Sequence, residues 1–351
     1  MTVRKGISFF LFFVLISVIA IVCYTADKDT YLAIKNANIP LLVFAFGLVV
    51  IGWLLDSLKF MTLARAAGEK LRFKDTFAVV LVNYFGCAIT PMQSGGGPFQ
   101  VYMLYQDGVA VGKSIAITLV RTIFTLVILA LVVPFALSLD ESVLQNYRYL
   151  SLYLYYILTF VIGAVALIVI SIVKPAIVKF IVEKIMKFIN RFGFIKAKKL
   201  KEILQRIYSE IDVYNTNMKE FVGNGKRWFA LSFLLAICHM FVYMSVMPVV
   251  ILATGFSVNF LQCLIAEALF LFVLYFVPTP GASGIAECGA ATICAMFMPL
   301  GAAGITAIIW RMLSEYTGIA LGAVAMIKSL GLSNANDLLA KSKSQDKFKT
   351  E

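Results

Sequence analysis

The chain has 351 residues, of which 61% are hydrophobic and only 14% are charged. Soluble domains contain about 45–50% apolar and about 25% charged residues, so this composition excludes a soluble enzyme, a disordered chain and a disulfide-rich secreted module. It predicts an all-α polytopic membrane protein. In such a protein the net charge of +12 indicates how the chain is oriented in the membrane before it indicates binding to nucleic acid.

A spanning helix needs about 20 predominantly apolar residues, and six runs of this kind are present. They lie near residues 7–24, 40–63, 114–137, 151–173, 228–253 and 302–327. Two further apolar regions, 77–104 and 259–298, are interrupted by Pro and Gly clusters. Each interrupted region is either a re-entrant hairpin of two short helices or one broken span.

The distribution of basic residues decides between these topologies. If both interrupted regions are re-entrant, 25 of the 31 Lys and Arg residues lie on the side of the N-terminus, three on the other side and three in the membrane. If only the first region spanned fully, the basic segment 174–227 would lie outside, against the positive-inside rule. The sequence therefore predicts six full spans, two re-entrant hairpins and cytoplasmic N- and C-termini. It also predicts that the first span is retained, because no small-x-small cleavage site follows it.

Both interrupted regions contain the motif Thr-Pro-x-x-Ser-Gly, and an arginine follows each motif in the next span. The copies are Thr90, Pro91, Ser94, Gly95 with Arg121, and Thr279, Pro280, Ser283, Gly284 with Arg311. The copies begin on opposite sides of the membrane, which predicts an inverted-topology repeat, an architecture of transporters. The expected organisation is a transmembrane domain over 1–330 with repeats 1–137 and 151–327, a cytoplasmic amphipathic insert at 174–227, and a polar tail at 331–351.

The two breaks are candidate binding sites. Backbone freed by Pro and Gly inside a membrane must be satisfied by protein or by a water-filled cavity, and the half-helix after each break offers an N-terminus that attracts anions. The alternative is a close-packed hinge that binds nothing. The candidate substrate-binding residues are Thr90, Pro91, Ser94, Gly95, Gly96, Arg121, Thr279, Pro280, Gly281, Ser283, Gly284, Glu287, Arg311 and Glu315.

Seven ionisable residues lie in the apolar regions, where they should face the bundle interior or water. They are Asp56, Lys59, Arg121, Glu267, Glu287, Arg311 and Glu315. Arg121 and Arg311 approach the midplane from opposite faces and suit a phosphate or carboxylate, which Arg binds bidentately. Alternatively the charges neutralise one another, since Arg311 and Glu315 are i,i+4 and Asp56 and Lys59 are i,i+3. Lys59 is expected near the cytoplasmic end of its span, where its amine can reach the membrane surface.

The three intramembrane glutamates leave several interpretations open. Glu267, Glu287 and Glu315 could hold a cationic headgroup or a proton, or could balance the two arginines. No Cys-x-x-Cys pair, nucleotide-binding loop or metal-ligand spacing is present, so no cofactor and no metal are predicted.

At its two breaks the chain resembles the membrane domain of the lysylphosphatidylglycerol synthase/flippase family, the multiple peptide resistance factors, and most of all its stand-alone flippase-like members. The residues that carry the resemblance run from Ile89 to Tyr102 and from Phe276 to Glu287, with Trp310, Arg311 and Tyr316. Gly97 and Ile285 depart from the family pattern, which has a polar residue and a glycine at these positions.

The resemblance implies movement of a phospholipid, such as lysylphosphatidylglycerol, between leaflets of a bacterial cytoplasmic membrane. It also implies, as the alternative, lysyl transfer from lysyl-tRNA to phosphatidylglycerol. In complete members that transfer resides in a soluble domain after the membrane part, which is expected to be absent here. A third hypothesis is that the chain anchors a partner synthase in the membrane. A second copy of the chain is a further candidate partner.

The segment 174–227 carries 13 basic and 5 acidic residues, a net charge of +8. Its apolar residues recur at helical spacing on both sides of Gly193, which predicts two amphipathic helices. Such a hairpin is expected to lie on the cytoplasmic face and on anionic headgroups. A surface for tRNA or for a partner protein is the alternative.

Overall fold

The computed structural model describes residues 3–139, 174–190, 202–209 and 225–330, together with positions 159, 162, 163, 211, 212, 215, 216 and 223. These residues form helices and contain no β-strand, so the predicted fold class, an all-α polytopic membrane protein, is confirmed. Three described helical stretches are long and apolar enough to cross a bilayer: Ile39–Ala66, Val111–Val132 and Lys226–Ala253. The predicted span at 151–173 falls almost entirely outside the described residues.

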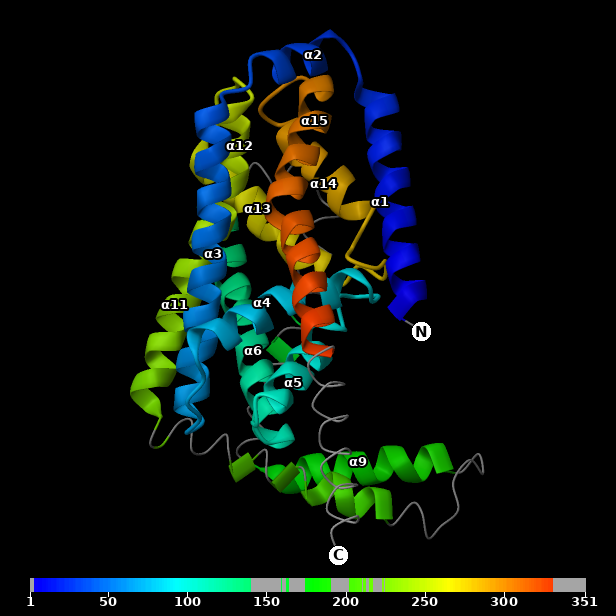
Figure 1. Cartoon of the computed structure of the whole chain (residues 1–351), viewed down its shortest axis with the longest axis vertical. Coiled ribbons are helices and arrows are strands. Elements are labelled where there is room, and N and C mark those ends of the chain that lie inside the picture. Colours follow the sequence, from blue (N-terminus) through cyan, green and yellow to red (C-terminus); the bar gives the residue numbers. More distant parts are fainter. Residues whose placement is uncertain are drawn as a thin grey trace, which may run out of the picture. The chain divides into compact units, whose positions relative to one another are not determined.

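The long helices occur where the apolar runs predict them (Figure 1). They are α1 (Val3–Thr25), α3 (Ile39–Ala66), α6 (Val111–Leu139), and α11 (Lys226–Met244) continued by α12 (Val246–Ala253). The last one is α15 (Leu300–Arg311), followed by a π-helical turn η1 (Met312–Tyr316) and by α-helix at 317–330. The apolar pattern predicts neither this π turn nor the interruption at Ser245 between α11 and α12.

Each interrupted region forms two short helices separated by its Pro and Gly cluster. The first comprises α4 (Phe73–Ala88) and α5 (Gly96–Gln106), and the second comprises α13 (Phe260–Leu274) and α14 (Ile285–Cys294). None of the four reaches the length of about 20 residues that a span requires. Helix α4 packs against α5 and α13 packs against α14, which is the arrangement predicted for helical hairpins.

The segment between α1 and α3, which lies between two predicted spans, contains a further helix, α2 (Lys28–Lys35). Its N-terminus is closed by a capping box in which Asp27 accepts from the N–H of Thr30 at 2.9 Å and Thr30 accepts from the N–H of Asp27 at 3.2 Å. The Thr30 hydroxyl also donates to the carbonyl of Gly301 at 2.9 Å, which joins α2 to the start of α15.

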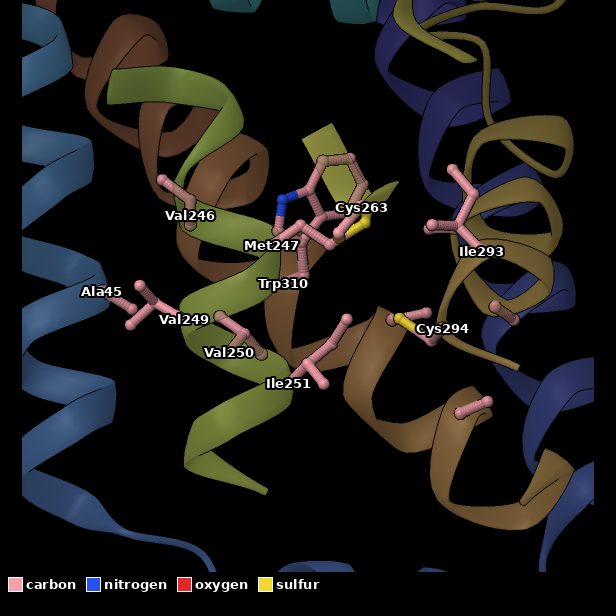
Figure 2. Close-up of a cluster of buried hydrophobic side chains, with 14 of the residues drawn as sticks. Ala45, Val246, Met247, Val249, Val250, Ile251, Cys263, Ile293, Cys294 and Trp310 are labelled. Atoms are coloured by element: carbon pink, nitrogen blue, oxygen red, sulfur yellow. The ribbon is translucent and has the colours of Figure 1, made fainter. Parts of the chain in front are cut away.

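The chain divides into two compact units, and two of the boundaries between them fall inside α3 and α11. The first unit takes the chain up to Ser57, Arg72–Gly108 and the chain from Cys238, and so contains both interrupted regions. Within it α15 packs against α1, α2, α12 and α14. Figure 2 shows part of its core, where α12 packs beside Trp310 of α15 and the cysteines of α13 and α14.

The second unit contains Leu58–Leu71 and Val109–Ile237. It includes α9 (Pro175–Asn190), an amphipathic helix of the insert, while the predicted division of the insert at Gly193 lies outside the described residues. Lys179 of α9 pairs with Asp212 at 2.6 Å, and the Tyr208 hydroxyl donates to Glu183 at 3.1 Å, so the two helices of the insert contact each other where they are described.

Helices of the first unit approach closely at glycines. A Cβ on Gly322 would lie 2.1 Å from the carbonyl oxygen of Leu81, which is backbone and cannot rotate away. We expect Gly322→Ala to lower the unfolding free energy by about 1–3 kcal/mol, the usual cost of overpacking. Gly47→Ala is the matched control, because nothing lies within 4 Å of its added Cβ. Thermal melting in detergent measures both, and equal melting temperatures for the two variants would contradict the close approach.

Candidate functional site

The two breaks contact each other within the first unit. Pro91 and Pro280, the prolines of the two motif copies, face each other in an isolated antiparallel bridge. Beside this bridge the N–H of Gly281 donates a hydrogen bond of 3.2 Å to the carbonyl of Cys87. The contact places the predicted residues of both motif copies at one junction, although they lie far apart in the sequence.

Both motif copies turn the backbone in the same way. The two residues after the proline have positive φ in each copy: Met92 (53°) and Gln93 (52°) in the first, Gly281 (61°) and Ala282 (55°) in the second. Three of these four residues have a Cβ, for which the left-handed region costs about 1–3 kcal/mol each. The surrounding structure therefore holds strain at the same positions of both breaks.

The hydrogen bonds that close the two turns correspond as well. The N–H of Ser94 and the N–H of Ser283 each donate to the carbonyl of the motif proline at 3.1 Å. The motif threonine bonds across its own turn in both copies, since Thr90 accepts from the N–H of Gly95 at 2.7 Å and Thr279 donates to the carbonyl of Ser283 at 3.0 Å. The sequence repeat is thus also a repeat of backbone structure.

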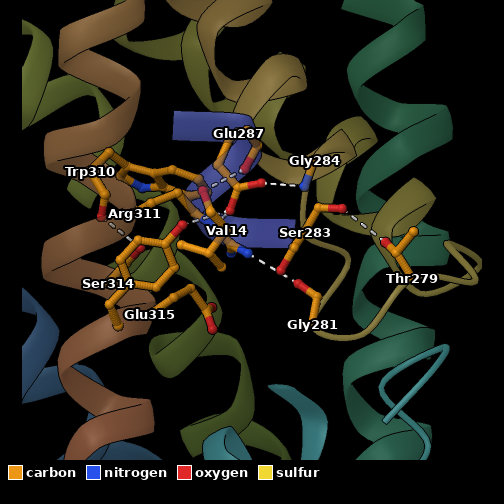
Figure 3. Close-up of polar contacts among 12 residues, drawn as sticks. Val14, Thr279, Gly281, Ser283, Gly284, Glu287, Trp310, Arg311, Ser314 and Glu315 are labelled. Atoms are coloured by element: carbon orange, nitrogen blue, oxygen red, sulfur yellow. Dashed lines mark hydrogen bonds and ion pairs between the residues drawn. The ribbon is translucent and has the colours of Figure 1, made fainter. Parts of the chain in front are cut away.

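Arg311 is the buried cation of this junction and is only 4% exposed. Its Nε lies 3.3 Å from Oε1 of Glu287, and its Nη2 donates to the carbonyl of Gly281 at 3.1 Å (Figure 3). The guanidinium also lies 5.7 Å from the ring centroid of Tyr316. Arg311 therefore binds the backbone of the second break directly, and it pairs with an acid on the helix that follows the break.

The carboxylate of Glu287 accepts hydrogen bonds from three neighbours. It accepts from the N–H of Gly284 at 2.5 Å, from Arg311, and from the hydroxyl of Tyr316 at 2.7 Å. The first of these bonds closes the N-terminus of α14, whose partial positive charge favours an acid. The anion expected at this half-helix is, in this structure, the chain's own Glu287.

The ion pair of Arg311 that the i,i+4 spacing predicts with Glu315 is made with Glu287 instead, although Glu315 also attracts the guanidinium. Glu315 lies inside the π turn over Met312–Tyr316, which changes which side chains share a face. The described ion pairs join Arg311 to Glu287, whereas Glu315 accepts from the hydroxyl of Tyr243 at 2.6 Å. π turns occur often at functional sites, and with this one Glu287 of α14 and Glu315 of η1 have different partners.

The N-terminus of α5 differs from that of α14 because it has no acid. The position that corresponds to Glu287, four residues after the motif serine, is Pro98. The N–H of Gly95 is taken by Thr90, and the N–H of Gly96 reaches the carbonyl of Gln93 at 3.5 Å. A Cβ on Gly96 would meet the side chain of Asn83 at 2.4 Å, so this glycine also permits the close packing of α4 and α5.

Two polar side chains near the motifs are buried without a hydrogen-bond partner among the described residues. They are the hydroxyl of Ser283, which is 1% exposed, and both amide atoms of Gln100, which is 0% exposed. Buried polar groups are nearly always hydrogen-bonded, so an unpaired one requires a partner from a ligand or from water. Both residues lie at or just after a break, where the sequence predicts a binding site.

Three other predicted charged residues lie on helices outside the two breaks. Arg121 is half-buried on α6 and belongs to the second unit, whereas Arg311 belongs to the first. Asp56 and Lys59 are each 1% exposed on α3. The expectation that the Lys59 amine reaches the membrane surface is therefore wrong, because the packing of α3 encloses this side chain.

Sequence reasoning missed the tyrosine that binds Glu315. Tyr243 lies in an apolar span and has no charged neighbour in sequence, so nothing in the local pattern pointed to it. The sequence did contain a signal for the Glu287 cap, because an acid three residues after the N-cap position, here Gly284, has the spacing of a capping box.

Comparison with known proteins places this fold in a family. Residues 7–322 match the family described as the lysylphosphatidylglycerol synthase TM region. The chain is also 28% identical over 314 residues to a UPF0104 membrane protein of Archaeoglobus fulgidus, an alignment that covers 88% of this chain and 92% of that protein. The chain is therefore a membrane protein that belongs to the lysylphosphatidylglycerol synthase transmembrane-region family.

Proposed function

We propose that the chain moves a phospholipid, lysylphosphatidylglycerol or phosphatidylglycerol, between the two leaflets of a bacterial cytoplasmic membrane, with both termini inside. The observation that carries this proposal is the junction of the two breaks, to which a buried arginine is bound through Gly281. Discontinuous helices that meet inside a bundle are where transporters bind their substrates. The unpartnered hydroxyl of Ser283 lies at the same junction.

The Arg311–Glu287 pair suits a lipid whose headgroup carries both charges. A phosphate would take the guanidinium of Arg311 in a bidentate contact, and the ammonium of a lysyl group would take the carboxylate of Glu287. In this exchange Arg311 and Glu287 each keep an opposite partner, so neither is left uncompensated in a medium where an isolated charge would be costly. Phosphatidylglycerol supplies only the phosphate and would leave Glu287 with Gly284 and Tyr316 alone.

Two parts of the proposal concern residues outside the junction. Arg121, on α6 of the second unit, is proposed to bind a lipid phosphate on that unit. The insert is proposed to lie on anionic headgroups, because α9 exposes Ile177, Phe180, Ile181 and Ile185 while the whole segment 174–227 has a net charge of +8. Binding of the insert to the membrane surface orients the protein in the membrane and takes no part in moving the lipid.

Leaflet exchange in liposomes tests the function. The purified chain is reconstituted with a labelled phosphatidylglycerol and, separately, with its labelled lysyl ester, and exchange is followed for wild type, Arg311→Ala and Arg121→Ala. We expect exchange above that of empty liposomes, faster for the lysyl ester, and at least about tenfold slower in Arg311→Ala, which corresponds to about 1.4 kcal/mol at the transition state.

The same preparation separates the alternatives. Wild-type exchange equal to that of empty liposomes would reject the transport proposal. Formation of lysyl-lipid from lysyl-tRNA by the chain alone would show the transferase instead. Liposomes with and without anionic lipid test the insert, since solvent exchange of the amides of α9 should slow only in the anionic membrane.

A further inference from the structure

One intramembrane glutamate of the first unit has no use in the site described above. Glu287 and Glu315 are both engaged, the first by Arg311 and the second by Tyr243. Glu267, in the middle of α13, is 0% exposed, and neither of its carboxyl oxygens has a hydrogen-bond partner among the described residues. This carboxyl is therefore enclosed by the fold without the polar contacts that the other two glutamates make.

The groups that face Glu267 are apolar or weakly polar. Helix α13 packs against α12 and α14. Helix α12 has no titratable side chain, while α14 presents the thiol of Cys294, and α13 itself presents Cys263 one turn earlier; both thiols lie within electrostatic reach of Glu267. Both cysteines are 0% exposed and lie in the core cluster with Trp310 and Met247 (Figure 2).

These surroundings decide which ligand the carboxyl takes. An isolated ionised carboxylate in an apolar interior costs far more than a neutral one, which loses only its hydrogen bonds. A sodium or calcium ion would need several oxygen ligands, and the neighbouring polar groups are thiols. No group of three or more His, Cys, Asp or Glu side chains suited to a metal ion occurs within the described part of the chain. A proton is the one ligand that needs no further donor atom.

We propose that Glu267 is a proton-binding site, a neutral carboxylic acid in this conformation that releases its proton when α13 moves relative to α12 and α14. Helix α13 leads directly into the second break, so a rearrangement of the Thr279–Gly284 turn displaces the helix that carries the acid. The coupling of proton release to helix movement rests on the proposed lipid transport. With this coupling, a proton gradient across the membrane is the energy source for that transport.

Chemical labelling tests the proton site without any transport assay. A carbodiimide that partitions into membranes, dicyclohexylcarbodiimide, reacts with protonated carboxyls in apolar surroundings. On the purified full chain we expect mass spectrometry to find the adduct on Glu267 and to lose it in Glu267→Gln. Glu287 should stay unlabelled, because its carboxylate is paired with Arg311. Absence of an adduct on Glu267 in the folded chain would overturn the proposal.

The neutral isostere tests the coupling. Glu267→Gln should keep the melting temperature of the wild type, since glutamine resembles the protonated acid. In liposomes it should keep lipid exchange but lose the response of exchange to an imposed pH gradient, whereas wild type and Cys294→Ala keep that response. A pH response unchanged in Glu267→Gln would overturn the coupling. If no variant exchanges lipid, the transport proposal fails while the labelling result still stands for the proton site.

Discussion

A chain with Glu287 replaced by glutamine is expected to lose about 3–5 kcal/mol of unfolding free energy, because Arg311 would stay charged and buried without its counter-charge. Glutamine preserves the shape of the side chain but has one acceptor oxygen, so it can accept either from the N–H of Gly284, which bonds Oε2, or from Tyr316, which bonds Oε1, and not from both. The substitution therefore removes the charge and one of these two hydrogen bonds. Arg311 is 4% exposed, so water cannot replace the lost partner.

A double-mutant cycle measures the pair itself. Arg311→Met alone leaves the carboxylate of Glu287 buried with only neutral donors, so it should also destabilise. Combined with Glu287→Gln it should cost less than the sum of the two single changes, by up to about 3 kcal/mol, as coupled neighbours do. Thermal or denaturant unfolding in detergent gives the four values.

Glu315→Gln is the matched control for this cycle. Glu315 lies on η1, close to Arg311 in sequence, but its described hydrogen bond comes from Tyr243. Its effect should be at most about 1 kcal/mol, because the amide oxygen can still accept from Tyr243, and its coupling with Arg311→Met should be smaller than that of Glu287→Gln, because Glu315 attracts Arg311 without pairing with it. Coupling of Arg311 with Glu315 in place of Glu287 would mean that the π turn does not separate the two residues in solution.

The same residues show how far the sequence predicts this site. The motif Thr-Pro-x-x-Ser-Gly identified both breaks, and its repetition extends to the φ angles of Gln93 and Ala282. Local pattern suffices to locate the breaks, because Pro fixes φ and removes a backbone donor while Gly admits positive φ wherever they occur. The partner of Arg311 could not be predicted, since helical spacing assumes a regular α-helix and the π turn breaks that assumption. Contact between the breaks depends on how separate hairpins pack, which no local signal reports.

A disulfide between the two breaks is expected to stop lipid exchange. Residues that face each other in an antiparallel bridge have Cα atoms about 4.5–5.5 Å apart, within the range of about 4.4–6.8 Å that a disulfide requires. Pro91→Cys combined with Pro280→Cys should therefore cross-link under mild oxidation. If transport needs the breaks to separate around a lipid headgroup, the oxidised protein should exchange lipid at the rate of empty liposomes, and reduction should restore it.

The experiment needs a background without the six native cysteines, all of which are free. Cys87 should become serine, because its thiol donates to the carbonyl of Gln93 at 3.3 Å within the first break, and the buried Cys263 and Cys294 should become alanine. The reduced double-cysteine protein controls for loss of the prolines, and each single-cysteine variant controls for the oxidant. Full exchange by a protein shown by mass spectrometry to be cross-linked would mean that the junction stays closed during transport. The lipid would then have to pass elsewhere, and Arg311 would be left with the structural role of holding the second break to α14.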